Sequence, residues 1–552
     1  MKSHTLRPFH SERSTNGEWT GCALFRGLRP TKILRARSAA MCQLTSAPFE
    51  PSVIKSIARR LRNREISALD LSATYLQQIE QTNKALNSFV CLNAEAVLEQ
   101  AQRIDEELDQ DIDRGVLAGI PIAVKDNICT EDFPTTAGSR TLLGYQSPYD
   151  ATIVRSLRRA GAIIIGKTNM DEFGMGSTSE SSYHDITRNP WDQSRVPGGS
   201  SGGSAVAVAS QQCVASIGSD TGGSVRQPAS HCGVVGLKPT YGYLSRHGLL
   251  SYASSFDCIG TLTSSVADCK ILLQSLTQAT ERNDTTHLGP PLRCDNESQC
   301  ESVNRTLHGF RIGVISQSLE CGVDGDVLHS FAESVELMRA LGAEVDIISC
   351  DTFTTGLPAY YVLAVSEASS NLARYDGVQE GTSAGAMSSS LSAFRAQFMG
   401  SEVKRRILMG TYTLSAGYAD AYYERACEVR ELVSAELNSK LLLYDALLTP
   451  VSTSIAPKLS TSLDNPLDMY TGDAMTVNVN LSGLPALVVR GRNVSNSGVS
   501  LPVGVQLIGR AFDETKLLTI GSIYERASYE KFELQQFAAK VFCDKFLLHT
   551  QS

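Results

Sequence analysis

The stretch from 195 to 226 constrains the fold of this chain most strongly. It reads RVPGGSSGGSAVAVASQQCVASIGSDTGGSVR and places two Gly/Ser-rich turns around a short apolar segment. Ser200 and Ser201 lie in the first turn and Ser224 closes the second. Glycine allows positive backbone φ angles, so such a turn can aim several N–H groups at one point. A serine beside these donors is typical of a nucleophile beside an oxyanion hole.

Two other interpretations of the stretch are disfavoured. A Gly/Ser run is most often a flexible linker. Here the run continues into apolar segments at 205–209 and 214–217, and a linker would not be buried at both ends. A phosphate-binding loop ends in Gly-Lys-Ser or Gly-Lys-Thr, whereas this run offers Gly202-Gly203-Ser204 and no lysine.

The composition is that of a globular protein. With 552 residues, 42% of them hydrophobic and 20% charged, the chain is expected to form one large embellished domain or two domains. A net charge of -8 argues against unaided nucleic-acid binding, so any RNA partner would need a further protein subunit. The chain contains no apolar run of about 18 residues or more, so no membrane span is predicted. The 14 cysteines include no Cys-x-x-Cys pair, so no metal site is expected. We expect the cysteines to be free thiols in a reducing compartment.

Residues 1–48 differ from the rest of the chain. They are basic and rich in Ser and Thr, and Glu12 and Glu18 are their only acidic residues. This composition is typical of an organellar transit peptide, with the mitochondrion as the expected destination and the plastid, or both, as alternatives. A disordered extension is the other interpretation. We expect one catalytic domain over 49–552.

Helical patterns alternate with apolar runs from Ser52 onward. A helix is predicted after Ser67, which forms a capping box with Asp70, and another over 94–107. The alternation predicts an α/β protein with a mixed or largely parallel sheet. The polar segment 281–306 is predicted to be a surface insertion, because strands continue on both sides of it. The predicted strands are 119–124, 162–167, 310–315, 345–348, 446–449 and 503–508.

A serine nucleophile at neutral pH needs a base within hydrogen-bond reach. The nearest histidines, His231 and His247, lie in a stretch that other features explain. Lys125 ends a predicted buried strand, and burial can lower the pKa of a lysine by several units. Lys125 is therefore a candidate base, with a surface lysine or an ordinary ion pair, such as one to Asp126, as the alternative.

The first Gly/Ser run and the segment 220–227 resemble the amidase signature family. The match includes Lys125, Ser200 and Ser224 at spacings similar to the family's. The resemblance implies that Ser224 is the nucleophile that forms an acyl-enzyme and that uncharged Lys125 is the base. Ser200 would lie in a cis peptide and bridge the two, with glycines relieving the crowding at the cis bond.

The resemblance has further implications for the site and the fold. It implies an oxyanion hole made by the backbone N–H groups of Thr221, Gly222, Gly223 and Ser224. It also implies the α/β amidase signature fold, in which helices cover both faces of a mixed β-sheet core.

Segments within 236–249, 358–372 and 402–423 resemble one branch of the family, the A subunits of glutamyl-tRNA(Gln) amidotransferases. For a glutamine substrate, this implies that Arg406 clamps the α-carboxylate and Asp473 holds the α-ammonium group. Tyr360 would line the pocket. Taken alone, Arg406 has the pattern of a solvated helix charge and Asp473 that of a turn residue.

The implied reaction is glutamine hydrolysis that supplies ammonia for converting misacylated Glu-tRNA(Gln) to Gln-tRNA(Gln). In the family's complex a B-type subunit binds tRNA and uses ATP and Mg, and a small C-type subunit is present too. This chain would then need no cofactor, would meet tRNA only through the complex and would not contact a membrane. A free-standing amidase acting on other amides and a catalytically silent scaffold are the alternatives.

Three positions depart from the pattern of the branch. Cys258 and Thr261 stand where the branch usually has Gln and Pro, and Arg490 lies in an otherwise apolar strand. None of the three is a triad residue. From the sequence, their effect on local packing and on contacts to partner proteins is an open question.

Overall fold

One eleven-stranded sheet organises the described part of the chain. The structure is a computed structural model that describes residues 52–277, 283–290, 305–320, 322–377, 391–461, 466–532 and 534. Strand order along the sheet is β1-β3-β2-β4-β6-β5-β10-β13-β9-β7-β8, and β11 pairs only with β12. The strands are β1 Phe89–Cys91, β2 Pro121–Lys125, β3 Ile163–Thr168, β4 Ala215–Asp220, β5 Val235–Lys238, β6 Cys258–Thr263, β7 Arg311–Ile315, β8 Glu344–Ile348, β9 Ala446–Pro450, β10 Ala486–Arg490, β11 Val494–Asn496, β12 Val499–Leu501 and β13 Gly504–Ile508.

The sheet is mixed, as predicted. Strand β2 pairs in parallel with β3 and β4, and β7 pairs in parallel with β8 and β9. The pairs β1–β3, β4–β6, β5–β6, β5–β10, β10–β13 and β9–β13 are antiparallel. All six predicted strands form, within about two residues at their ends. The sequence pattern did not predict β6, which interrupts its apolar residues with Gly260 and threonines, and at β4 it indicated only an apolar segment. It also missed the short strands β1, β5, β11 and β12.

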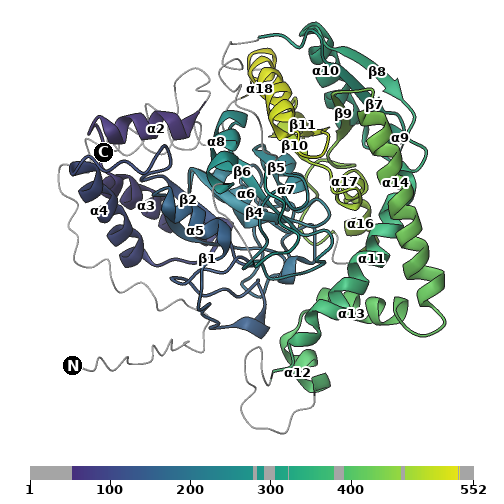
Figure 1. Ribbon diagram of the computed structural model, residues 1–552, viewed down its shortest axis with the longest axis horizontal. Coiled ribbons are helices and arrows are strands. Elements are labelled where there is room, and N and C mark those ends of the chain that lie inside the picture. Colours follow the sequence, from purple (N-terminus) through teal and green to yellow (C-terminus); the bar gives the residue numbers. More distant parts are fainter. Residues whose placement is uncertain are drawn as a thin grey trace. The chain divides into compact units, whose positions relative to one another are not determined.

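Helices cover both faces of this sheet (Figure 1). On β10, Leu487 packs against Gly521 of α18, whereas the side chain of the adjacent Val488 lies beside Gly504, near Ser230 of α7. Neighbouring residues of a strand point to opposite faces, so α7 and α18 lie on opposite sides. The helices are α2 Val53–Arg62, α3 Ala68–Leu86, α4 Ala94–Asp109, α5 Thr152–Arg159, α6 Gly202–Ala209, α7 Arg226–Cys232, α8 Val266–Leu276, α9 Gln317–Glu320, α10 Gly325–Ala340, α11 Gly356–Asn371, α12 Leu391–Phe398, α13 Ser401–Thr413, α14 Arg425–Leu441, α16 Pro466–Thr471, α17 Val477–Leu481 and α18 Glu514–Lys531.

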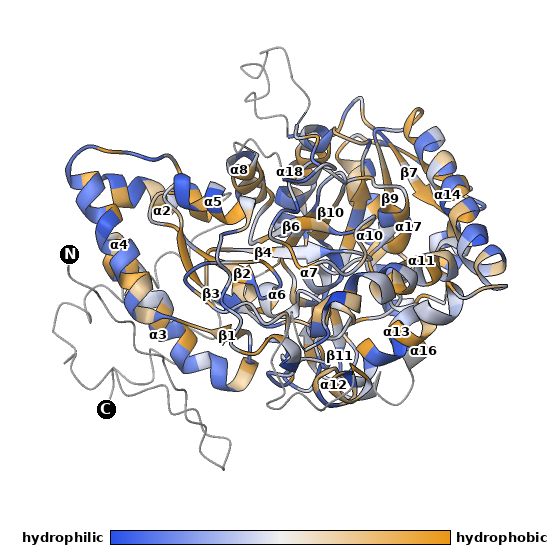
Figure 2. Cartoon of the chain, turned by 60° about the horizontal axis from the view of Figure 1, so that its bottom comes forward, coloured by the Kyte–Doolittle hydropathy of each residue, from blue (hydrophilic) through white to orange (hydrophobic). Residues whose placement is uncertain are grey.

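The helices are amphipathic where the sequence predicted it. The Ser67 side chain accepts a hydrogen bond from the Asp70 N–H at the start of α3. Figure 2 shows strands that are mainly hydrophobic and surrounding helices such as α4 with mixed residues. Within the described ranges, no helix combines the length and apolarity needed to cross a membrane. Five residues of α3 recur at helical spacing and are all buried, Ala68, Leu71, Tyr75, Leu76 and Ile79.

Two of the predicted segments lie partly or wholly outside the described residues. The predicted transit peptide at 1–48 is wholly outside. Of the predicted insertion at 281–306, the structure describes 283–290 and 305–306. Within the described part, the Leu288 N–H donates to the carbonyl oxygen of Gly242 at 2.8 Å, so this part packs on the chain near β5.

The topology brings the two Gly/Ser turns together. Strands β2 and β4 are parallel neighbours, with Val124 opposite Ile217. Their carboxyl ends therefore lie at the same edge of the sheet, where Lys125 ends β2 and Asp220 ends β4. The first turn leads into α6 and the second into α7, so both turns lie at this edge.

Candidate active site

The side chain of Lys125 ends among serine hydroxyls. Its Nζ lies 2.8 Å from both Ser200 Oγ and Ser201 Oγ. It also lies 2.9 Å from the Ser219 hydroxyl and 3.3 Å from the Ser219 carbonyl oxygen. Lys125 is fully buried. The structure thus brings two members of the expected triad, Lys125 and Ser200, into direct contact.

Burial changes the charge of Lys125. It lowers the pKa of the amine from 10.5 to about 7, and the carboxylates of Asp171, Asp220 and Asp257 offset part of this effect. A large fraction of the lysine is therefore uncharged near neutral pH. An uncharged amine has a lone pair, so it can take up a proton.

The hydrogen bonds around Lys125 leave that lone pair available. The Ser201 hydroxyl donates to the Ser219 carbonyl oxygen at 3.0 Å, so it accepts from the amine. The Ser219 carbonyl can only accept as well. Together these two oxygens use both N–H bonds of an uncharged amine. The lone pair then faces the remaining hydroxyl protons, of Ser200 and Ser219, and a proton can pass from Ser200 to Lys125. Ser201 and Ser219 were not expected as partners of the lysine, and the position of Ser219 directly before Asp220 was their only signal.

The first turn contains a cis peptide bond between Gly199 and Ser200. A Cβ atom at Gly199 would overlap the carboxylate of Asp171, so only glycine fits there. The Asp171 N–H donates to the Ser200 carbonyl at 3.3 Å, and its carboxylate accepts from the Ser179 N–H at 2.9 Å. Asp171 therefore supports this turn. Its role was not expected from sequence, although Asp171 and Glu172 are the only charged residues between Lys167 and Glu180.

Ser224 lies next to the first turn. Its carbonyl oxygen accepts a hydrogen bond from the Ser201 N–H at 3.0 Å. The Ser224 hydroxyl has no hydrogen bond to another residue in the described ranges, and 9% of the residue surface is exposed. The expected nucleophile is thus nearly buried but still accessible from outside. Its backbone contacts Ser201, the residue next to Ser200, which in turn contacts Lys125.

The second turn supplies backbone donors, with one change from the expected set. The Gly223 N–H donates to Asp220 Oδ1 at 3.0 Å, so it is not free to bind an oxyanion. The N–H groups of Thr221, Gly222 and Ser224 form no hydrogen bond with a described residue. These three N–H groups are available to bind an oxyanion. Gly223 has a different role, because its φ of +137° produces the turn.

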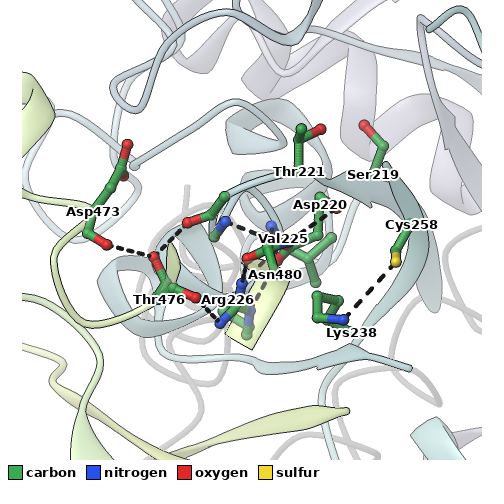
Figure 3. A network of polar contacts seen from close by, with 12 residues as sticks. Ser219, Asp220, Thr221, Val225, Arg226, Lys238, Cys258, Asp473, Thr476 and Asn480 are labelled. Carbon is green, nitrogen blue, oxygen red and sulfur yellow. Dashed lines mark hydrogen bonds and ion pairs between the residues drawn. The ribbon is translucent and has the colours of Figure 1, made fainter. Parts of the chain in front are cut away.

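A buried ion pair holds the second turn in place (Figure 3). The Asp220 carboxylate contacts the Arg226 guanidinium at 2.9 and 3.0 Å and accepts from the Val225 N–H at 3.1 Å. Asn480 also donates to Asp220, at 2.9 Å. Burial alone would raise the pKa of Asp220, but Arg226 outweighs it and the pKa is lowered. Asp220 is therefore a carboxylate at neutral pH and can hold Gly223 and Val225.

Arg406 has one open donor group. Its Nε donates to Glu402 Oε1 at 2.8 Å and its Nη1 to the Tyr252 hydroxyl at 2.6 Å. Its Nη2 is buried and has no hydrogen-bond partner among the described residues. Buried polar groups are nearly always paired, so an unpaired guanidinium nitrogen predicts a ligand. Arg406 is thus buried, contrary to the solvated-charge alternative.

Asp473 lies near Arg406 as a second buried charge. Its carboxylate accepts from Ser177 Oγ at 2.9 Å and from the Tyr361 hydroxyl at 2.7 Å. Burial raises the pKa of Asp473 to about 6, so it is still mostly ionised at neutral pH. The guanidinium of Arg406 lies 5.4 Å from the centre of the Tyr361 ring. One tyrosine therefore borders both charges.

Tyr360 lies at a different part of the site from Tyr361. Its hydroxyl packs against Gly222, where a Cβ atom would overlap it. Tyr360 therefore borders the second turn, and its neighbour Tyr361 is the residue that contacts Asp473. From the sequence, Tyr360 alone was expected in the pocket. The side-by-side tyrosines of α11 were the available signal for the second one.

The three departures each have a partner in the fold. The pairs are Cys258 Sγ with Lys238 Nζ at 3.8 Å, Thr261 Oγ1 with Cys269 Sγ at 3.2 Å, and the Arg490 guanidinium 4.8 Å from the centre of a Trp191 ring.

Comparison with known proteins identifies the family. The family model described as Amidase matches residues 70–518, far more than half of the chain. The chain belongs to the amidase signature family. This confirms the resemblance on which the expected triad rests. It also confirms the α/β amidase fold with a mixed sheet between two layers of helices.

Relatives of this amidase cover most of its length. It is 50% identical over 500 residues to the A subunit of the chloroplastic/mitochondrial glutamyl-tRNA(Gln) amidotransferase of Arabidopsis thaliana, covering 90% of this chain and 93% of the relative. The protein of the same name from Vitis vinifera is 47% identical over 506 residues, covering 91% and 92%. A crystal structure of the A subunit of glutamyl-tRNA(Gln) amidotransferase from Thermotoga maritima matches with 39% identity and a TM-score of 0.67, covering 82% of this chain and 90% of that chain. The peptide amidase of Stenotrophomonas maltophilia matches with 28% identity and a TM-score of 0.72, covering 88% and 98%.

Proposed function

We propose that this amidase is the glutamine-hydrolysing A subunit of an organellar glutamyl-tRNA(Gln) amidotransferase. It releases ammonia for the conversion of misacylated Glu-tRNA(Gln) to Gln-tRNA(Gln). The observation that carries the proposal is a buried cation with an open donor, Arg406, close to a buried anion, Asp473, in an amidase site. This pair matches the carboxylate and ammonium groups of an α-amino acid. Subunits of that name from plants and bacteria are its relatives at 45–50% identity.

The reaction begins when Ser224 Oγ attacks the side-chain amide carbon of glutamine. Its proton passes to Ser200, whose own proton passes to uncharged Lys125. The N–H groups of Thr221, Gly222 and Ser224 stabilise the oxyanion. When the C–N bond breaks, the proton returns through Ser200 to the leaving nitrogen and ammonia departs. Water then hydrolyses the glutamyl ester by the same proton path and releases glutamate.

Glutamine would be oriented by its two charged groups. Arg406 Nη2 donates to the α-carboxylate and Asp473 accepts from the α-ammonium group. Tyr360 lines the pocket beside the turn that holds the oxyanion. A substrate that lacks either charge would leave one buried ion unpaired, which is costly. The site therefore favours glutamine over simple amides.

The rest of the reaction belongs to partner subunits in this proposal. A B-type subunit binds the tRNA and uses ATP and Mg to activate the glutamyl group, and a small C-type subunit completes the complex. This chain supplies ammonia and needs no cofactor of its own. The plant relatives are named chloroplastic/mitochondrial, which supports an organellar location, with 1–48 as transit peptide and 49–552 as the amidase domain.

The test is an amidotransfer assay with the chain and its two partner subunits. With Glu-tRNA(Gln), ATP and Mg, glutamine is expected to yield Gln-tRNA(Gln). The Arg406→Gln variant is expected to raise KM for glutamine at least about 10-fold, because it loses a charged hydrogen bond. The same variant should use ammonium chloride at the wild-type rate. Rapid hydrolysis of simple amides by the isolated chain, unaffected by Arg406→Gln, would instead identify a free-standing amidase.

A further inference from the structure

Glu402 joins two elements of the substrate pocket. Its Oε1 accepts from Arg406 Nε at 2.8 Å and from the Tyr470 hydroxyl at 2.9 Å. Arg406 and Glu402 belong to α13, whereas Tyr470 belongs to α16. The two helices lie next to each other in Figure 2. A single buried carboxylate oxygen therefore binds the expected carboxylate clamp to a second helix.

Tyr470 is also connected to Asp473, both directly and through Tyr361. The Asp473 N–H donates to the Tyr470 carbonyl oxygen at 3.2 Å. The Tyr470 ring lies 4.4 Å from the ring of Tyr361, whose hydroxyl donates to Asp473 at 2.7 Å. The guanidinium of Arg406 lies 5.4 Å from both of these rings. These contacts form a closed ring that includes both charges expected to bind glutamine.

Glu402 also limits how Arg406 can turn. It holds the Nε edge of the guanidinium while Tyr252 holds Nη1, which leaves only Nη2 open. The second oxygen of Glu402 pairs with Arg405. Burial alone would raise the pKa of Glu402, but Arg406 outweighs it and the pKa is lowered, so the carboxylate is ionised. A planar guanidinium fixed on two sides has one defined direction for its remaining donor.

We infer that Glu402 and Tyr470 are positioning residues that hold Arg406 and Asp473 in place for the α-carboxylate and the α-ammonium group of an amino acid such as glutamine. They touch neither the reacting atoms nor the triad. Their effect is on substrate selection, because a ligand with both charges fits the fixed pair and a simple amide does not. The inference rests on the proposed function and adds the structural basis of its specificity.

Tyr470→Phe tests the inference with the smallest change, because it removes only the hydroxyl that binds Glu402. We expect KM for glutamine to rise about 5- to 30-fold, with a smaller fall in kcat, since the hydrogen bond involves a charged group. Labelling of Ser224 by an uncharged fluorophosphonate should stay within about twofold of wild type, because this probe uses the triad and not the charges. Tyr418→Phe, on an exposed tyrosine, is the matched control and should leave both values unchanged.

Glu402→Gln provides an independent measurement. Glutamine at 402 keeps a carbonyl oxygen as acceptor but carries no charge to neutralise Arg406, so a similar rise in KM is expected. The double variant should raise KM little further, because both changes break the same hydrogen-bonded unit. An unchanged KM in Tyr470→Phe, or equal losses in KM and in Ser224 labelling, would overturn the inference. If the wild-type chain did not hydrolyse glutamine at all, the proposed function would fail instead, so the two failures can be told apart.

Discussion

The Ser224→Ala variant is expected to lose glutamine hydrolysis by roughly 10⁴-fold or more, because no other hydroxyl can form the acyl-enzyme. Ser224 is the serine with accessible surface beside three backbone donors, while Ser200 and Ser201 are bound to Lys125. Release of ammonia from glutamine is the measurement. Fold loss is not expected, since the Ser224 hydroxyl makes no hydrogen bond with a described residue.

Two controls make this result specific. Ser439→Ala, on an exposed position of α14, should hydrolyse glutamine at the wild-type rate. In the complex with its partner subunits, Ser224→Ala should still form Gln-tRNA(Gln) when ammonium chloride replaces glutamine. Retention of more than about one tenth of the glutaminase activity would assign the nucleophile to another residue.

Lys125→Met is expected to lower kcat for glutamine by about 10²- to 10⁴-fold, the usual contribution of a general base. Methionine fills a similar volume in the buried site but has no lone pair that can take the proton from Ser200. Lys125→Arg should be equally inactive, because an arginine does not lose its proton at any accessible pH. An active Lys125→Arg enzyme would show that the positive charge, and not the base, is what the site requires. Steady-state kinetics with folded variants, checked by circular dichroism, gives the answer.

Much of this site could be predicted because its strands and turns have clear patterns in the sequence. The six apolar runs that became strands are short and bounded, and all of them except the edge strand β8 are buried, so they could be recognised from the sequence. The first Gly/Ser turn precedes α6 and the second follows β4, so their meeting at one sheet edge depends on strand order alone. The family resemblance supplied the roles of Lys125, Ser200 and Ser224, and the fold brings Lys125 and Ser200 into contact.

What could not be predicted depends on how side chains and backbone groups are oriented in the folded chain. Whether Tyr360 or Tyr361 meets Asp473 is set by the rotation of α11, because adjacent helix residues point about 100° apart. Gly223 was expected to donate to an oxyanion, but Asp220 takes its N–H because Arg226 holds that carboxylate in reach. Asp171 supports the cis turn from a loop after β3. The paired tyrosines and Asp171 are visible in the sequence, but the orientation that creates these contacts is not.

The most direct test of the proposed mechanism is the rate at which an uncharged fluorophosphonate labels Ser224 as a function of pH. The mechanism requires an uncharged Lys125, whose pKa burial lowers to about 7. Below this value the lysine is protonated and cannot accept the proton from Ser200. The labelling rate is therefore expected to rise roughly tenfold per pH unit below the pKa and to level off above about pH 8. A rate that is the same from about pH 5.5 to 9, or a pH profile unchanged in Lys125→Met, would contradict the central claim.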